Sequence, residues 1–384
     1  MSDATTFPGL ALENATKRGT KPAIREKYHG IWQTYSWADY YDQVRDFGLG
    51  LQALGFKAGD KLAVIGDNRP QLYWAQIAAQ ALGGAAVPVY QDSIADELAY
   101  VLGDADVSII VAENQEQVDK SIAMLDRLPQ VTHIVYDDDR GLSDYDHPKL
   151  IAYQAVREKG AAGDKAAFDA GVKALGPDAI ATMCYTSGTT GRPKGVMLSH
   201  ANLVSAVRGF VDAEDIRESD DFLSYLPMAW VGDATYSLGT SLMTGACCNC
   251  PESPETLQRD LRELGPTGMI APPRAWEAIL SETQVKAEDI SGLKKWVYET
   301  FRKAAVDAVA KQEEGKELSF GEKLKLRIGE FLVYAPLRDQ FGLRRARWCY
   351  TGGAPLGPDT FRFFRALGIN LKQLYGSTEL AGLC

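Results

Sequence analysis

The feature that most constrains the fold of this chain is a regular alternation between short apolar segments and segments with helical spacing. The apolar segments lie at 61–65, 85–89, 107–111 and 133–136, and the helical ones near 70–82, 94–103 and 115–127. Strands that alternate with helices usually pair in parallel, because the chain must return to the other end of the sheet between two parallel strands and a helix makes that connection. The alternation therefore predicts an α/β fold. A further helix is expected over 36–55, with Ser36 as its N-cap.

Composition limits the class of protein. With 384 residues, of which 46% are apolar, the chain can bury a large core and form two or more α/β units. The formal net charge of −10 argues against a general nucleic-acid binder, which would present a basic surface. An anionic ligand must therefore be held by local donors.

The cysteines and the N-terminal segment indicate a reducing compartment. Six cysteines lie mostly in apolar surroundings, and the segment MSDATTFPGL lacks a basic stretch followed by an apolar one. We therefore expect a cytoplasmic protein. A metal site at Cys247, Cys248 and Cys250 is the weaker interpretation, because no second pair of ligands lies at suitable spacing. No run reaches the roughly 18–20 apolar residues that span a bilayer, so any membrane contact is expected to be peripheral.

Two segments interrupt the alternation. Residues 137–178 begin with an acidic run and contain scattered glycines, which favours a solvated surface excursion over a site. Residues 273–342 are largely helical and of mixed charge, and the polar stretch 311–321 is expected to be a loop between helices.

Residues 185–200, YTSGTTGRPKGVMLSH, combine the groups that a phosphate-binding loop needs. Glycines let backbone amides approach an anion, hydroxyls add donors, and a lysine supplies positive charge. These residues are Gly188, Gly191 and Gly195, the hydroxyls of Thr186, Ser187, Thr189 and Thr190, and Lys194. A purely structural hairpin turn is the alternative, although a turn alone does not account for four hydroxyls and a lysine.

The order of residues in this loop differs from that of a nucleoside-triphosphatase loop. That loop has Gly-Lys-Ser/Thr opening a helix, whereas here the order is Pro193-Lys194-Gly195. The flanking residues 183–185 and 196–198 have strand character. We therefore expect the loop to connect two strands as a mobile flap.

Three further motifs follow the loop in a fixed order: Leu226-Pro227-Met228, Thr351-Gly352-Gly353-Ala354-Pro355 and Tyr375-Gly376-Ser377-Thr378-Glu379. Together the four motifs resemble the adenylate-forming (AMP-binding) superfamily of acyl-CoA synthetases, luciferases and adenylation domains. The segments APPRAWEAI and LVYAPLRDQFGL make the chain most similar to long-chain fatty acid–CoA ligases.

The resemblance implies a fold and a domain organisation. The fold is α/β, with two packed parallel-type sheets flanked by helices, as in the N-terminal domain of acyl-CoA synthetases. Residues 1–384 would form this large AMP-binding domain. Its subdomains would comprise approximately 57–210, with the phosphate loop, and 10–56 plus 211–384, with the acyl-pocket and adenine motifs.

The resemblance also implies a two-step reaction. A carboxylate attacks the α-phosphorus of Mg-ATP to give acyl-adenylate and pyrophosphate, and coenzyme A then displaces AMP. The loop Thr186–Lys194 would hold the β- and γ-phosphates. Thr186 and Glu379 would hold Mg²⁺, which prefers oxygen ligands. Lys194, Thr186 and Glu379 are thus the candidate catalytic residues, and a solvated carboxylate is the alternative for Glu379.

The later motifs would contact the nucleotide and the acyl chain. Tyr375 would stack on adenine, with Gly376, Ser377 and Thr378 beside the nucleotide and Thr378 donating to the α-phosphate. Small residues leave room for a flat ring and a tail, and these are Gly352, Gly353 and Ala354. Trp230 stands where many relatives carry histidine, and either walls the acyl pocket or packs in the core. Trp276 and Arg274 are expected to have structural roles.

The family pattern continues beyond the end of this sequence. Relatives carry a barrel segment, a hinge and a mobile C-terminal domain with a lysine, so we expect a truncated domain with weak nucleotide binding and impaired turnover. The alternatives are a fatty acyl–AMP ligase, another carboxylic acid–CoA ligase, or a non-catalytic nucleotide- or acyl-binding remnant. A homodimer and peripheral contact with the inner membrane stay open. Two basic clusters would meet coenzyme A phosphates or lipid headgroups, or lie on solvated helix faces: Lys323, Lys325 and Arg327, and Arg344, Arg345 and Arg347.

Overall fold

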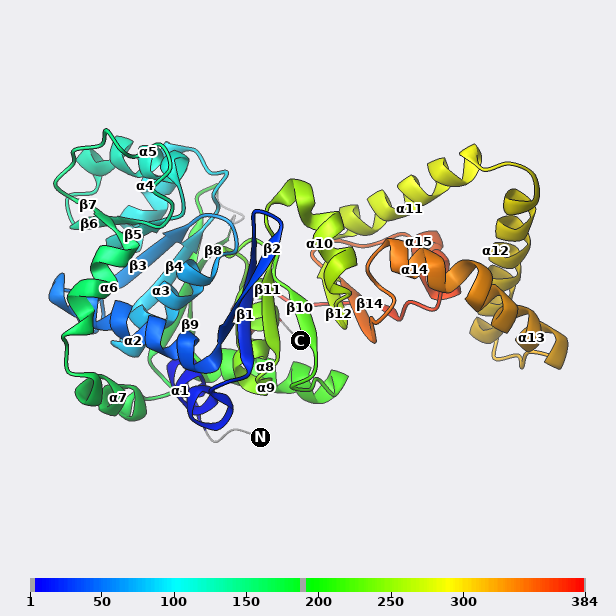
Figure 1. Ribbon diagram of the computed structural model, residues 1–384, viewed down its shortest axis with the longest axis horizontal. Coiled ribbons are helices and arrows are strands. Elements are labelled where there is room, and N and C mark those ends of the chain that lie inside the picture. Colours follow the sequence, from blue (N-terminus) through cyan, green and yellow to red (C-terminus); the bar gives the residue numbers. More distant parts are fainter. Residues whose placement is uncertain (1–3, 187–190, 383–384) are drawn as a thin grey trace. The chain divides into compact units, whose positions relative to one another are not determined.

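The computed structural model describes residues 4–186 and 191–382, which form two compact units (Figure 1). The first unit comprises Met1–Ser219, Ser224–Ser253 and Ser377–Leu383, and the second comprises Asp220–Leu223, Pro254–Gly376 and Cys384. Residues 10–56 lie in the first unit together with residues 57–219 and 224–253: the helix over Trp37–Ala53 packs against helices of this unit, and the strand over Pro22–Tyr28 pairs with the one over Cys247–Cys250.

A seven-stranded sheet in the order β7-β6-β5-β3-β4-β8-β9 forms the centre of the first unit. Its strands are β3 (Lys61–Ile65), β4 (Ala85–Val89), β5 (Val107–Ala112), β6 (His133–Tyr136), β7 (Leu150–Ala152), β8 (Ile180–Thr186) and β9 (Lys194–Ser199). All neighbours pair in parallel except β8 and β9, which pair antiparallel. The predicted strands and their parallel pairing are confirmed.

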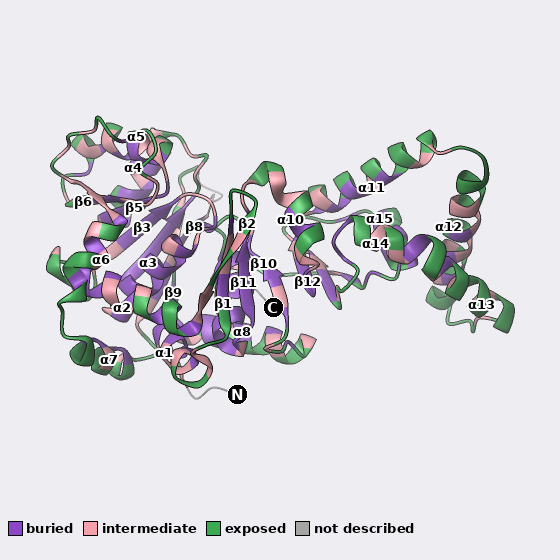
Figure 2. Ribbon diagram, viewed as in Figure 1, coloured by how far each residue is buried: buried purple, intermediate pink, exposed green. Residues whose placement is uncertain are grey.

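Helices cover both faces of this sheet. Leu62 and Val64 of β3 pack with α2 and α3, whereas the alternate residues Ala63 and Ile65 pack with α4, as the two-residue period of a strand requires. The helices of the unit are α1 (Phe7–Arg18), α2 (Trp37–Ala53), α3 (Pro70–Ala81), α4 (Ala95–Asp104), α5 (Gln115–Ala123), α6 (Tyr153–Ala161), α7 (Lys165–Ala174), α8 (His200–Glu214) and α9 (Thr240–Thr244), with the short helices η1 (Leu125–Arg127), η2 (Asp233–Gly239) and η5 (Thr378–Leu380). Figure 2 shows the sheet and its helix contacts as mostly buried.

Three more strands of the first unit form a separate ladder. β1 (Pro22–Tyr28) pairs antiparallel with β2 (Ile31–Ser36) and parallel with β11 (Cys247–Cys250). The Ser36 hydroxyl caps α2 by accepting a hydrogen bond from the Asp39 amide, and the Asp39 carboxylate accepts one from the Ser36 amide. The predicted N-cap is thus confirmed.

The second unit contains a three-stranded parallel sheet, β12-β13-β14, and a helical segment inserted between β12 and β13. Its elements are β10 (Asp221–Leu223), η3 (Pro254–Thr256), α10 (Leu257–Leu264), β12 (Gly268–Ala271), α11 (Pro273–Asp289), α12 (Gly292–Glu313), α13 (Phe320–Gly329), η4 (Glu330–Tyr334), α14 (Ala335–Gln340), β13 (Trp348–Thr351), α15 (Pro358–Ala366) and β14 (Leu371–Gln373). The predicted loop within 311–321 separates α12 from α13.

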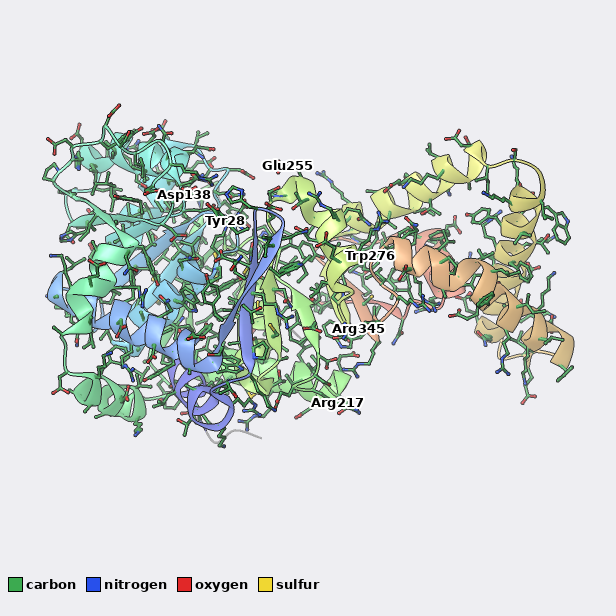
Figure 3. The ribbon with its side chains drawn as sticks, viewed as in Figure 1. Tyr28, Asp138, Arg217, Glu255, Trp276 and Arg345 are labelled. Carbon is green, nitrogen blue, oxygen red and sulfur yellow. The ribbon has the colours of Figure 1, made fainter. Side chains whose placement is uncertain are left out.

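Trp276 anchors α11 in the second unit (Figure 3). It is fully buried, its indole N–H donates to the Tyr350 carbonyl at 3.2 Å, and its ring meets Phe364 edge-on at 4.9 Å. Trp276 therefore packs as expected, whereas Arg274 is exposed. The predicted α/β class, with sheets flanked by helices, is confirmed.

The expectation that residues 137–178 form a solvated excursion is wrong in part, because α6 packs closely on α2. A Cβ at Gly160 would lie 1.9 Å from the Asp46 carbonyl oxygen, and one at Gly50 would lie 2.0 Å from that of Val156. These glycines allow the two helices to approach, whereas the scattered glycines of 137–178 were interpreted as part of a solvated surface excursion. Burial, with the charges of Glu26 and Glu113, also raises the pKa of Asp137 to about 7.

Candidate functional site

The β8–β9 hairpin positions the phosphate-binding loop. Thr186 ends β8 and Lys194 begins β9, and the two residues are paired in the antiparallel register. Both strands are therefore present as predicted, with Thr186 half-buried and Lys194 exposed where the loop leaves the sheet. The predicted loop residues Ser187, Gly188, Thr189 and Thr190 lie outside the described residues.

Residues flanking the loop are attached to α4. The Tyr100 hydroxyl donates to the Pro193 carbonyl at 3.2 Å, and the Arg192 guanidinium lies 5.4 Å from the Tyr100 ring centroid. The Tyr185 hydroxyl donates to Asp104 at 2.7 Å. The sequence analysis missed these contacts, because Tyr100 and Asp104 lie more than one element away from the loop.

Two of the loop glycines have different structural roles. Gly191 has a φ of +93°, a region that favours glycine. A Cβ at Gly195 would lie 2.9 Å from the Tyr185 ring, so Gly195 lets that ring pack across the hairpin. This packing is a reason for glycine at 195 that the phosphate-binding interpretation did not include.

Glu379 lies in the same unit as Lys194 and Thr186. It belongs to η5, which contacts β9, and Ala381 behind it is buried in the core of the first unit. The Glu379 carboxylate is exposed, and hydrogen bonds from its own backbone N–H and the Ser377 hydroxyl hold its pKa below the usual value. The carboxylate is therefore ionised at neutral pH, as a Mg²⁺ ligand must be.

The remaining nucleotide motifs divide between the units. Ser377 and Thr378 lie in the first unit, and Tyr375 and Gly376 in the second together with Gly352–Ala354. Within the second unit the two motifs follow the neighbouring parallel strands β13 and β14, so they leave the same sheet edge.

Two hydrogen bonds hold these turns side by side. The Leu374 amide donates to the Thr351 carbonyl at 2.7 Å, and the Gln373 side chain donates to the Ala354 carbonyl at 3.2 Å. Gly353 has a φ of +87°, and the Tyr375 side chain is 79% exposed. An exposed aromatic ring beside a turn of small residues is the arrangement that a stacked base requires.

Trp230 lies shortly before the π-helix η2, which begins at Asp233. Its side chain is partly exposed and forms a hydrogen bond with Tyr90. Burial raises the pKa of the Tyr90 hydroxyl, and the hydrogen bond with Trp230 lowers it in part. Leu226 and Met228 are buried. Trp230 is therefore accessible to a ligand, as is Pro227, whereas Leu226 and Met228 are not.

The buried carboxylate of Asp233 is linked to this motif by hydrogen bonds, and it was not predicted from the sequence. Asp233 accepts hydrogen bonds from the Tyr73 hydroxyl at 2.8 Å and the Asn68 amide at 3.1 Å, and Asn68 also donates to the Leu226 carbonyl at 3.0 Å. Burial raises the pKa of Asp233 to about 6. The one sequence signal was an aspartate within an otherwise apolar stretch.

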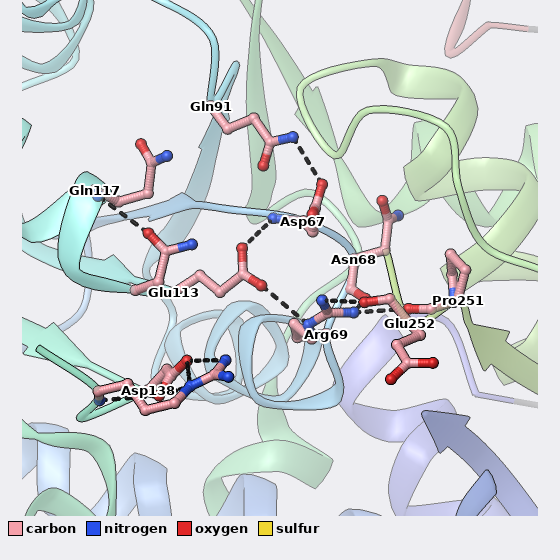
Figure 4. A network of polar contacts seen from close by, with 11 residues as sticks. Asp67, Asn68, Arg69, Gln91, Glu113, Gln117, Asp138, Pro251 and Glu252 are labelled. Carbon is pink, nitrogen blue, oxygen red and sulfur yellow. Dashed lines mark hydrogen bonds and ion pairs between the residues drawn. The ribbon is translucent and has the colours of Figure 1, made fainter. Parts of the chain in front are cut away.

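A second polar network lies at the carboxyl ends of β3 and β5 (Figure 4). Arg69 Nε lies 3.0 Å from Glu113 Oε1, and the other guanidinium nitrogens donate to the carbonyls of Pro251 and Glu252 at 2.7 and 2.8 Å. The Asp67 amide donates to Glu113 Oε2 at 2.7 Å. The network thus fixes the turn after β3 against the end of β11.

Comparison with known proteins identifies the family. The sequence profile described as AMP-binding enzyme matches residues 12–384. The chain belongs to the AMP-binding enzyme family. Among curated relatives, it is 29% identical over 395 residues to the long-chain-fatty-acid–CoA ligase ACSBG2 of Xenopus laevis, covering 99% of this chain and 52% of that protein. It is 28% identical over 394 residues to human ACSBG1, covering 98% and 52%.

Solved structures of other proteins share the fold. The N-terminal domain of FACL13 from Mycobacterium tuberculosis matches with a TM-score of 0.69 and 20% identity, covering 98% of this chain and 77% of that one. The A-PCP didomain of a carboxylic acid reductase from Segniliparus rugosus, in complex with AMP, matches with a TM-score of 0.74 and 18% identity, covering 98% and 53%. The chain spans about half the length of the curated relatives it matches.

Within residues 4–186 and 191–382, no helix is both long and apolar enough to cross a bilayer.

Proposed function

We propose that this chain carries the nucleotide- and acyl-binding part of a long-chain fatty acid–CoA ligase that forms AMP. The observation that carries the proposal is the placement of an exposed Lys194, its register partner Thr186, and an ionised Glu379 on η5 beside β9. A cation and a carboxylate on neighbouring elements suit a polyphosphate bound with Mg²⁺.

In the first step, a fatty acid carboxylate oxygen bonds to the α-phosphorus of ATP as the bond to the β-phosphate oxygen breaks, releasing pyrophosphate. Lys194 would neutralise the leaving phosphates, and Glu379 with Thr186 would hold Mg²⁺, which when bound offsets phosphate charge. In the second step, the coenzyme A thiolate displaces AMP to give the thioester.

Further residues of each unit would bind the rest of the nucleotide and the acyl chain. Tyr375 would stack on adenine beside Gly352–Ala354, and Thr378 would donate to the α-phosphate. Trp230 would wall the acyl pocket, and its exposure beside the buried Leu226 and Met228 supports this role.

We place the protein in the cytoplasm, with peripheral membrane contact, and leave a homodimer as a further expectation. Support for a reducing compartment comes from five buried cysteines that form no disulfide with one another: Cys184, Cys247, Cys248, Cys250 and Cys349.

Exchange of pyrophosphate into ATP, driven by fatty acids of graded chain length, tests the proposal. Exchange should rise with chain length and fall on the order of 10²–10³-fold in Lys194→Ala. The exposed Lys57 lies on another loop, so Lys57→Ala is the matched control and should leave exchange unchanged.

Other outcomes would favour other functions. Preference for short or aromatic acids contradicts the long-chain assignment. Exchange without thioester formation indicates a fatty acyl–AMP ligase, and ATP binding without exchange indicates a non-catalytic binder.

A further inference from the structure

The helical segment of the second unit exposes an apolar stripe along α13 and η4. Phe320 is 83% exposed and Phe331 81%, and Leu324 and Ile328 between them are also exposed. Spacings of four, four and three residues put these side chains on one side of the helix. Soluble proteins seldom expose several large apolar side chains together, so the stripe calls for an external partner.

The opposite side of α13 and η4 is fixed against α12, so the stripe faces outward. The Tyr334 hydroxyl donates to the Phe301 carbonyl at 2.6 Å. A Cβ at Gly329, the buried residue of α13, would lie 2.7 Å from the Tyr334 ring and 2.8 Å from that of Phe301. This close contact leaves little freedom for α13 to turn its apolar side inward.

The stripe continues onto the start of α12. A groove of about 350 Å³ is lined by Leu332 of η4 and Leu293 of α12, among other residues, and Trp296 lies one turn beyond Leu293. Both α12 side chains are strongly exposed, Leu293 by 74% and Trp296 by 61%. We call the combined surface the helical patch, comprising Leu293, Trp296, Phe320, Leu324, Ile328, Phe331 and Leu332.

Positive charges border the helical patch. The exposed basic residues next to it in sequence are Lys294, Lys295, Lys323, Lys325 and Arg327. The two acidic residues of α13 and η4 are paired, Glu322 with Lys311 and Glu330 with Arg338. Along α13 the surface therefore combines exposed aromatic and aliphatic groups with a basic border, whereas the exposed Asp289 and Glu299 lie near the α12 part of the patch in sequence.

We propose that the helical patch docks this unit onto the surface of an anionic lipid bilayer. Phenylalanine, tryptophan and leucine side chains enter the boundary between headgroups and acyl chains, while lysines and arginines meet the phosphates. A second copy is the poorer occupant, because a symmetric contact through this patch would bring the basic borders together. Docking would let the protein take long-chain fatty acids from that bilayer, and this part of the inference rests on the proposed function. The docking itself does not depend on the proposed function.

Co-sedimentation with vesicles tests the docking. Vesicles containing on the order of a third phosphatidylglycerol in phosphatidylcholine should bind the protein, and raised salt should weaken binding. Phe320→Ser with Phe331→Ser should reduce binding at least about tenfold, as should Lys323→Glu with Lys325→Glu and Arg327→Glu.

The matched control uses two isolated exposed residues of the first unit. Ile31 and Ile94 are 64% and 62% exposed, and Ile31→Ser with Ile94→Ser should leave binding unchanged. Circular dichroism should show the same melting temperature for all variants. Three results overturn the proposal. The first is vesicle binding by the Phe320/Phe331 variant that equals wild-type binding, and the second is no binding of the wild-type protein to anionic vesicles. The third is concentration-dependent dimerisation that the variant loses, in a protein that does not bind vesicles. Fatty acid-dependent exchange without vesicles should persist in the variant, which separates this test from that of the proposed function.

Discussion

Helices α3 and α13 both carry many apolar residues, but they meet different surroundings. In α3 every residue from Pro70 to Ala81 is buried except Gln71, because the helix lies between α2 and the strands β3 and β4. In α13 only Gly329 is buried. Apolar content therefore does not reveal whether the partner of a helix lies within the chain or outside it.

The two regions also treat charge differently. The first unit encloses carboxylates and pairs them, as in the Arg69–Glu113 and Asp233 networks, which fix the turns near the candidate site. The helical segment of the second unit keeps its charges at the surface. We expect substitutions in the first region to change folding stability and those in the second to change binding.

The largest expected difference concerns apolar side chains. Trp74→Ala in α3 should cost about 3–5 kcal/mol of unfolding free energy, because its side chain is 1% exposed and leaves a cavity. Phe331→Ala, in the helical patch, should change stability by no more than about 0.5 kcal/mol. Urea unfolding followed by circular dichroism measures both. A comparable loss in the two variants would break the comparison.

The next effect concerns the buried ion pair. Arg69→Met leaves Glu113 buried without its cation and should cost about 3 kcal/mol. Arg127→Met removes an exposed pair with Asp96 and should cost less than about 1 kcal/mol in the same assay. Adding Glu113→Leu to Arg69→Met should restore much of the loss. If the two arginine variants lose the same stability, Arg69 does not act through its buried carboxylate.

The smallest effect is a pH dependence at Asp233. Its pKa rises from 3.8 to about 6 on folding, so the folded state binds the proton more tightly and stability falls as pH rises from 4 to 6. The shift corresponds to roughly 3 kcal/mol at most. Asp233→Asn should remove this slope from unfolding curves measured across that range. If the pH dependence of stability persists unchanged in this variant, it arises from the titration of another group.

Local pattern predicted much of the fold, including the two strands on either side of the candidate phosphate loop. The strands from β3 to β6 and the Ser36 cap follow from spacing and residue type within a few positions. The hairpin around the loop was predicted in the same way, from strand character on both sides.

Contacts between distant segments could not be predicted. The packing of α6 on α2 depends on backbone approach at Gly50 and Gly160, which are far apart in sequence. The Asp233 network joins residues more than 150 positions apart. The exposure of α13 depends on which surfaces other elements cover. The spacing of apolar residues within the helix does not predict whether its apolar side is covered.

The most direct test of the candidate site is calorimetric titration of ATP with and without Mg²⁺. We expect Mg²⁺ to tighten ATP binding to the wild-type chain, and Glu379→Gln to reduce this gain in affinity by at least about tenfold, or ~1.4 kcal/mol. The exposed Glu97→Gln, on α4, is the matched control and should titrate as wild type. Identical Mg²⁺ dependence in Glu379→Gln and wild type would contradict the placement of the metal at η5 beside the loop.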